Sequence, residues 1–183
     1  MSSMIVKAAR FAQQQHEGQT RKGGEPYINH PMRVAGIVTM CEHTTEDMIA
    51  AAWLHDVVED TEVTDVELRR LFNENIANLV YHLTDVYTKE NYPELNRAKR
   101  KQREHERLGN TNMFCAPVYG VHTIKLADRI DNTTDVFARG RKWAEKYIGE
   151  SFQLIAYLNY GDTELRDFLI RRLVDIDKEM KND

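Results

Sequence analysis

Residues 50–58 read AAAWLHDVV, an apolar stretch that is interrupted by a histidine and an aspartate. Its apolar residues follow the three- and four-residue spacing of one helix face. Thr44, followed three positions later by Asp47, is typical of a helix N-terminus and predicts that the helix begins there. Burying a histidine and an aspartate at the end of such a helix is costly unless a metal or a polar partner compensates them. His55 and Asp56 are therefore the first candidates for a functional site.

Helical spacing also dominates the rest of the chain, and sustained two-residue alternation is absent from the sequence. Thr64 and Glu67 form a second predicted helix start, and further helices are expected at about 141–158 and 163–179. The apolar stripes that carry this prediction are Ile5, Ala8, Ala9 and Ala12; Val34, Ile37 and Val38; Ile76, Leu79, Val80 and Leu83; and Leu165, Phe168, Leu169 and Leu173. The pattern predicts an all-α fold of roughly eight to nine helices in a single globular domain spanning residues 1–183.

Composition narrows the classes of function. The 183 residues are 42% hydrophobic and 30% charged, with a formal net charge of −4, which gives no general reason to expect binding to nucleic acid or to a membrane. No apolar run reaches the ~20 residues needed to span a bilayer. The two cysteines, Cys41 and Cys115, lack CxxC spacing and are expected to be small buried apolar side chains. These features favour a reducing cytoplasm.

Two further residues complete a candidate metal site. His30 lies in PYINHP, directly before a proline, and Asp128 lies in IKLADRIDN, within an apolar helical stretch. Together with His55 and Asp56 they offer the mixed nitrogen and oxygen ligands that suit Mn²⁺, Fe²⁺, Co²⁺ or Zn²⁺. Spacing alone leaves an alternative open, in which His30 caps a helix and Asp128 pairs with Arg129 or another basic residue.

Acidic and basic residues beside these motifs suggest chemistry on a phosphate. Glu59 and Asp60 follow the histidine–aspartate pair within one helical turn, where a carboxylate can take a proton from a metal-activated water; an exposed acidic loop is the alternative. In QTRKGGEPY, Arg21 and Lys22 offer phosphate contacts or a planar guanidinium for stacking. Gly24 would let the backbone approach a ligand closely. A solvated turn is the alternative for this segment.

Residues 94–108 read ELNRAKRKQREHERL and are almost all charged or polar. This stretch is either a solvated helix face or a basic wall along a phosphate-binding cleft.

The motifs RKGGEPYINHP, AAWLHDVVEDT and IKLADRIDN, in this order, resemble the HD hydrolase domain of the Rel/SpoT family, and most closely its short stand-alone forms. The resemblance covers about residues 4–135, and the C-terminal helices at about 139–180 lie outside it. It implies an all-helical fold and a Mn²⁺-dependent hydrolase that removes the 3′-pyrophosphate of ppGpp or pppGpp. Its implied residue roles are metal ligation by His30, His55, Asp56 and Asp128, water activation by Glu59 and Asp60, and substrate binding by Arg21, Lys22, Gly24 and Asn132.

The chain departs from the long members of that family after Asn132, where Thr133, Thr134 and Asp135 follow. No nucleotide contact is therefore carried over to 134 and 135. Alternatives that the sequence leaves open are action on another nucleotide (the 2′-phosphate of NADPH, an adenosine alarmone or a deoxynucleotide) and a non-catalytic nucleotide-binding regulator. The sequence is compatible with a homo-oligomer and with functional pairing with an alarmone synthetase, and it decides neither.

Overall fold

The computed structural model describes residues 3–110 and 117–182. The helices within these residues are α1 (Met4–Gln15), α2 (Asn29–Thr39), α3 (Glu46–Leu54), α4 (Val57–Asp60), α5 (Asp65–Leu71), α6 (Glu74–Leu83), α7 (Arg97–Gly109), α8 (Val118–Asn132), the 3₁₀ helix η1 (Val136–Arg139), α9 (Arg141–Ile155) and α10 (Thr163–Asn182). In the described part of the chain the only β-type pairing is an isolated bridge between Thr20 and Pro26. The predicted all-α fold is confirmed.

Helix starts follow local capping chemistry. The Thr64 hydroxyl accepts a hydrogen bond from the backbone N–H of Glu67, as predicted. The predicted cap at Thr44 is wrong by one residue, because the N-cap of α3 is Thr45, whose hydroxyl accepts from Met48 N–H. The Thr44 hydroxyl instead donates to the carbonyl of Val38, which ties the loop back to the end of α2.

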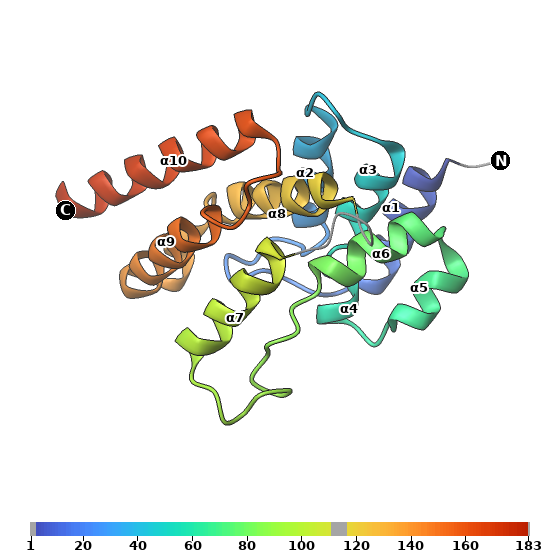
Figure 1. Cartoon of the computed structure of the whole chain (residues 1–183), viewed down its shortest axis with the longest axis horizontal. Helices are drawn as coiled ribbons and strands as arrows, with labels where there is room; N and C mark the ends of the chain where they lie inside the picture. The colour runs from blue at the N-terminus through green and yellow to red at the C-terminus, as the bar shows by residue number, and fades with distance from the viewer. Residues whose placement is uncertain (1–2, 111–116, 183) are drawn as a thin grey trace.

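Helix α8 is the centre of the molecule (Figure 1). It contacts α2, α3 and α6 on one side and α10 on the other, and most of its residues are buried. Gly120 permits this close packing, since a Cβ atom there would lie 2.9 Å from Leu79 Cδ2 and 3.1 Å from Met48 Cγ. Polar residues on α8 are consequently held among apolar neighbours, where each needs a partner.

The chain breaks its helix at the histidine–aspartate pair. Helix α3 ends at Leu54, His55 and Asp56 are its continuation in αR conformation, and the one-turn helix α4 begins at Val57. The predicted single helix across this stretch is thus two helices. This break is one reason why the described residues form more helices than expected.

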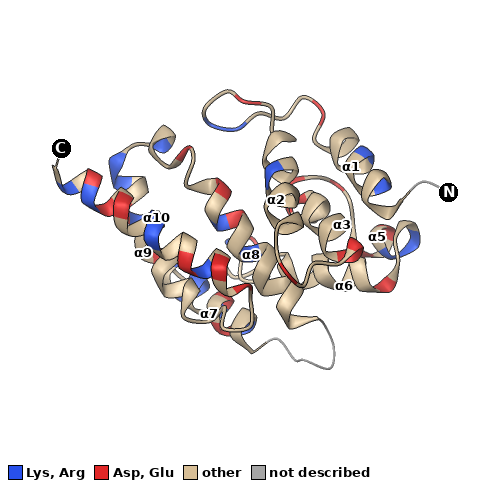
Figure 2. Ribbon diagram, turned by 90° about the horizontal axis from the view of Figure 1, so that it is seen from above, with Lys and Arg blue, Asp and Glu red and all other residues tan. Residues whose placement is uncertain are grey.

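The C-terminal helices α9 and α10 close the other side of α8. Acidic and basic residues, coloured red and blue on the ribbon, interleave along α10, as expected for a helix with a solvated face (Figure 2). None of the helices in the described residues combines the length and hydropathy needed to cross a membrane. Cys41 is half-buried and a free thiol, and Cys115 lies outside the described residues.

Candidate metal centre and nucleotide cleft

Two imidazole rings meet at the junction of α2, α3 and α8. His30 Nε2 and His55 Nε2 lie 3.2 Å apart, and both side chains are 2% exposed. The opposite ring nitrogens are occupied, because His55 Nδ1 bonds the carbonyl of Ala52 at 2.8 Å and His30 Nδ1 bonds Asp131 Oδ2 at 2.6 Å. Both of these acceptors require an N–H at Nδ1, which leaves the Nε2 lone pairs facing one another. Such an arrangement needs a cation or a proton between the rings.

Two carboxylates approach the same point. Asp56 Oδ2 lies 3.4 Å from His30 Nε2, and Asp56 Oδ1 lies 3.2 Å from His55 Nε2. Asp128 Oδ1 lies 3.4 Å and 3.9 Å from the same two nitrogens. A metal–ligand distance of about 2.1 Å places neighbouring ligands about 3.0–3.4 Å apart, so most of these separations match the edges of a coordination shell. The ligand atoms of His30, His55 and Asp56 all lie within 4.8 Å of one another, and Asp128 lies beside them, so the donor set fits a divalent cation.

The electrostatics of the cluster lead to the same conclusion. Burial works against a charged His30, but its hydrogen bonds to Asp128, Asp131 and Asp56 raise its pKa to about 11. The pKa of Asp56 is lowered despite burial, through its charge interaction and hydrogen bonds with the two histidines. In the metal-free protein a proton thus supplies the positive charge that the carboxylates demand. Metal binding must displace this proton, so the affinity for metal falls as the pH falls.

Asp131 supports the cluster from behind and was missed by sequence reasoning. Its carboxylate accepts from His30 Nδ1, and it also accepts from Arg33 Nε at 2.5 Å and Arg33 Nη2 at 3.2 Å. Arg33 in turn bonds Glu25 through Nη1 at 2.6 Å and Nη2 at 3.1 Å. Its position near the cluster could have been predicted from IKLADRIDN, because Asp131 lies three residues after Asp128 and therefore on the same helix face.

Tyr27 connects the cluster to the acidic pair. Its hydroxyl oxygen lies 2.6 Å from Asp56 Oδ2 and 2.6 Å from Asp60 Oδ2. Burial, followed by the charges of Asp56 and Asp60, raises the pKa of Tyr27, so the phenol keeps its proton. One hydroxyl proton serves only one carboxylate at a time, which makes Tyr27 a shared donor that restricts both side chains.

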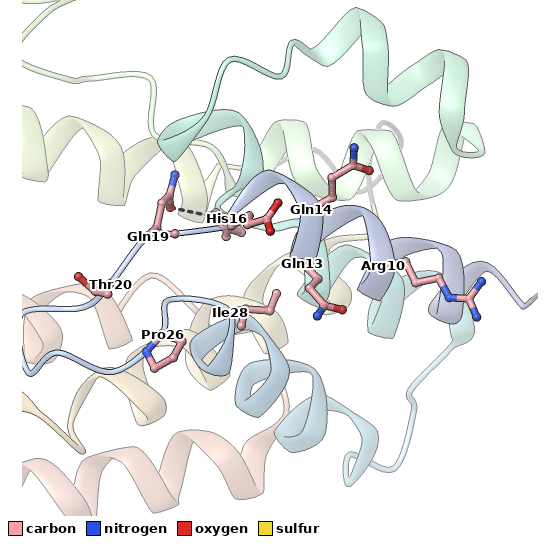
Figure 3. Close-up of a pocket in the computed structure, with 10 residues that line it drawn as sticks. Arg10, Gln13, Gln14, His16, Gln19, Thr20, Pro26 and Ile28 are labelled. Atoms are coloured by element: carbon pink, nitrogen blue, oxygen red, sulfur yellow. Dashed lines mark hydrogen bonds between the residues drawn. The ribbon is translucent and has the colours of Figure 1, made fainter.

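The outer face of Tyr27 is supported by α1 and the turn after it. The His16 ring stacks on Tyr27 with centroids 4.8 Å apart. His16 Nδ1 bonds Gln19 Oε1 at 2.8 Å (Figure 3). Gln19 Nε2 in turn donates to the Asp60 carbonyl at 2.9 Å. Beyond His16 lies a surface groove of about 590 Å³ between α1 and residues 17–28, lined mainly by glutamine and other polar side chains. None of the four clustered residues lines this groove.

Glu59 stands at the edge of the cleft. Its Oε1 accepts from the backbone N–H of Asp85 at 2.6 Å. Desolvation, opposed by Lys125 and reinforced by Asp85 and Asp56, raises the pKa of Glu59 to about 7. A carboxyl group that titrates near neutral pH is suited to exchange a proton with a reacting water.

The cleft over these groups has a volume of about 290 Å³. Helix α7 contributes Arg97 and Lys101, so one edge of the basic stretch faces the cleft, while Glu104 and His105 are buried. Helix α9 contributes Trp143 and Tyr147, whose rings stack with centroids 4.9 Å apart. Sequence reasoning missed these aromatic residues, since they belong to the C-terminal third that the motifs do not cover.

Arg21 lies between this cleft and an adjoining cavity of about 390 Å³. Its guanidinium donates to both carboxylate oxygens of Asp135 at 3.0 Å and to Asn132 Oδ1 at 2.8 Å. Asn132 Nδ2 donates to Asp128 Oδ1 at 2.5 Å, which links Arg21 to the metal cluster. Asp135, which had been left without a role, therefore fixes the plane of Arg21.

Of the other two residues predicted to contact the substrate, Lys22 lines a cavity and Gly24 does not. Lys22 lines the adjoining cavity. Gly24 is absent from the lining of both cavities and has a φ of +84°, where its N–H bonds the Arg21 carbonyl at 2.9 Å. Its visible contribution is the turn that presents Arg21 and Lys22, because glycine adopts this left-handed conformation without strain.

Comparison with known proteins gives the family. Residues 8–158 match the model of the HD domain. The chain belongs to the HD-domain family. It is 36% identical over 156 residues to the guanosine-3′,5′-bis(diphosphate) 3′-pyrophosphohydrolase MESH1 of Xenopus tropicalis, covering 83% of this chain and 80% of the relative. It is also 40% identical over 131 residues to a probable enzyme of the same name from Synechocystis, covering 70% of this chain and only 16% of that much longer protein.

Solved structures agree with this assignment to the HD domain. A structure described as a metazoan ortholog of SpoT that hydrolyzes ppGpp superposes with a TM-score of 0.80 at 26% identity, covering 96% of both chains. The protein lmo0812 of Listeria monocytogenes superposes with a TM-score of 0.63 at 26% identity, covering 84% of this chain and 98% of that one. This HD-domain protein therefore resembles a stand-alone hydrolase over nearly its whole length.

Replacing Asp131 with asparagine should weaken Mn²⁺ binding by about 10–100-fold, the usual effect of losing a carboxylate that orients a ligand histidine. Mn²⁺ titration followed by electron paramagnetic resonance measures this affinity. Glu25→Gln is the matched control, because it removes the other acid bound to Arg33 but does not touch His30. Equal affinities in the Asp131→Asn variant and the wild type would show that Asp131 does not support a metal ligand.

Proposed function

We propose that this protein hydrolyses the 3′-pyrophosphate of ppGpp or pppGpp, giving GDP or GTP and pyrophosphate. The observation that carries the proposal is the convergence of His30, His55, Asp56 and Asp128 beneath a cleft with acidic and basic walls. The relatives named as 3′-pyrophosphohydrolases support the choice of substrate, and MESH1 does so over most of its length.

We propose that these four side chains hold one divalent cation, Mn²⁺, although Fe²⁺, Co²⁺ and Zn²⁺ also suit the donor set. When bound, the cation would supply Lewis-acid activation of water and of the scissile phosphate. The protein's own part is to present the two Nε2 lone pairs, which the Ala52 carbonyl and Asp131 fix by holding the opposite ring nitrogens. Asn132 and Tyr27 similarly orient the two carboxylates.

Glu59 and Asp60 are proposed as the residues that handle the water proton. Glu59 is anchored by the Asp85 N–H and has a pKa of about 7, so its ionised form can accept a proton at neutral pH. Asp60 is positioned by Tyr27 and by the hydrogen bond from Gln19 to its carbonyl. The proton taken from water is then available to the departing 3′-oxygen of the ribose.

The nucleotide is proposed to bind across the two adjoining cavities. With its donors directed at Asp135 and Asn132, Arg21 offers mainly the flat face of its guanidinium, which suits stacking on a base. Lys22 lines the same cavity and can meet a phosphate, Gly24 shapes the turn, and Asn132 lies where the ribose would pass. An alarmone synthetase in the same compartment, which we take to be the cytoplasm, is the class of enzyme that would supply this substrate.

The purified protein with Mn²⁺ should convert ppGpp to GDP and pyrophosphate at a kcat/KM higher than for an adenosine alarmone or NADPH. Products are resolved by anion-exchange chromatography, with each substrate offered separately. Release of orthophosphate from ppGpp would contradict the proposal, because it would place the cut within the pyrophosphate group. Preferential turnover of NADPH would contradict the assigned substrate.

Combining Glu59→Gln with Asp60→Asn should retain bound Mn²⁺ and lower kcat for ppGpp by at least ~10²-fold, the usual loss with a general base.

In the wild type, kcat/KM should fall as the pH drops below about 7, because protonated Glu59 cannot accept a proton. The Glu59→Gln variant alone should no longer show this fall in kcat/KM at acidic pH. Glu67→Gln on α5, which does not line the cleft, is the control. Loss of Mn²⁺ from the double variant would identify the acids as metal ligands instead.

A further inference from the structure

Two cations on α8 lie at the bottom of the cleft, and the chemistry described above does not use them. Lys125 and Arg129 are one helical turn apart, and both line the cleft beside Asp128 and Tyr147. Lys125 is only 8% exposed. Burying positive charge in this way is costly unless an anion compensates it.

Within residues 3–110 and 117–182, the carboxylates of Asp85, Asp128 and Glu59 favour the charged form of Lys125, but no hydrogen bond joins its Nζ to any of them. The nearest ion-pair contact of Lys125 Nζ is Asp128 Oδ2 at 3.8 Å, beyond hydrogen-bond length. Arg129 forms no ion pair with a carboxylate in this part of the chain, and its Nε atom is buried without a hydrogen-bond partner. The guanidinium instead lies 5.1 Å from the centre of the Tyr147 ring.

The other cations of the cleft are engaged or exposed: Arg21 pairs with Asp135, and Arg139 is exposed and lies 4.7 Å from the centre of the Trp143 ring. Arg97 donates to both oxygens of Glu150, at 2.9 Å and 2.8 Å. Lys101 Nζ bonds Asp85 Oδ2 at 2.8 Å. The buried, unused capacity to bind an anion is therefore concentrated on Lys125 and Arg129.

Their position relative to the metal cluster identifies the kind of anion. Asp128 Oδ1 faces His30 Nε2 at 3.4 Å, and its other oxygen faces Lys125. The ammonium group therefore lies across a single carboxylate from the metal ligands. A phosphate bound at the cluster would have the next phosphate of a diphosphate within reach of this lysine and of Arg129.

We propose that Lys125 and Arg129 form the subsite for the distal phosphate of the 3′-pyrophosphate, and that they favour diphosphate esters over monophosphate esters. This inference rests on the proposed function. In the reaction, the water oxygen bonds to the phosphorus attached to the ribose 3′-oxygen, and the bond from that phosphorus to the 3′-oxygen breaks. The 3′-oxygen takes a proton, and the distal phosphate leaves as one half of pyrophosphate, held by charge-assisted hydrogen bonds.

The test compares ppGpp with guanosine 5′-diphosphate 3′-monophosphate, which lacks only the distal phosphate. Lys125→Met and Arg129→Met should each lower the ratio of kcat/KM for the first substrate to that for the second by about 10–100-fold, the usual effect of losing a hydrogen bond to a charged group. Lys99→Met, an exposed lysine on α7 outside the cleft, should leave the ratio unchanged. Lys125→Arg should recover part of the ratio.

Direct binding gives a second readout. Calorimetric titration of the metal-free protein should show that inorganic pyrophosphate binds Lys125→Met and Arg129→Met at least ~10-fold more weakly than wild type. Equal losses for both substrates in the kinetic test, or unchanged pyrophosphate binding, would overturn the subsite. A wild-type protein that hydrolyses neither substrate would instead overturn the proposed function, which keeps the two failures distinct.

Discussion

The structure depends on one electrostatic constraint, the meeting of two imidazole lone pairs and two carboxylates in a buried junction of three helices. Without a positive charge at their centre these groups repel one another in a medium that screens them poorly. A proton on His30 can satisfy part of this demand, but the proposed divalent cation would satisfy all four side chains at once. The neighbouring hydrogen bonds of Asp131, Asn132 and Tyr27 then follow as the means of holding each ligand in position.

The fold serves this constraint through α8. Its packing against α3 and α6 requires a glycine at position 120, and α8 brings Asp128 to histidines that lie far away in the sequence. At the break between α3 and α4, His55 and Asp56 keep αR conformation, and both side chains reach the same point. On the opposite side, α9 adds the aromatic wall of the cleft.

Much of the fold and the core of the site could be predicted from the sequence, because helical periodicity and short motifs are local properties. Thr64 was predicted as a cap correctly, and Thr44 was wrong because two adjacent threonines offer the same local chemistry. The four proposed ligands could be named from motifs, and the structure brings them together. Their role in holding a metal stays a prediction.

What could not be predicted depends on contacts across the chain. The stacking of His16 on Tyr27, the pairing of Asp135 with Arg21, and the unpaired Nε of Arg129 all involve elements whose proximity no local pattern reveals. The basic stretch was ambiguous for the same reason. Only the packing of α7 shows that Arg97 and Lys101 face the cleft, whereas Glu104 turns inward to accept from the backbone N–H groups of Val86 and Tyr87.

The most direct test is a crystal structure of the protein grown with Mn²⁺, with diffraction data that identify manganese by its anomalous scattering. We expect one anomalous peak about 2.0–2.3 Å from His30 Nε2, from His55 Nε2 and from one oxygen each of Asp56 and Asp128. A peak elsewhere, or no peak at this junction under conditions in which the protein is active, would contradict a shared cation as the basis of the site.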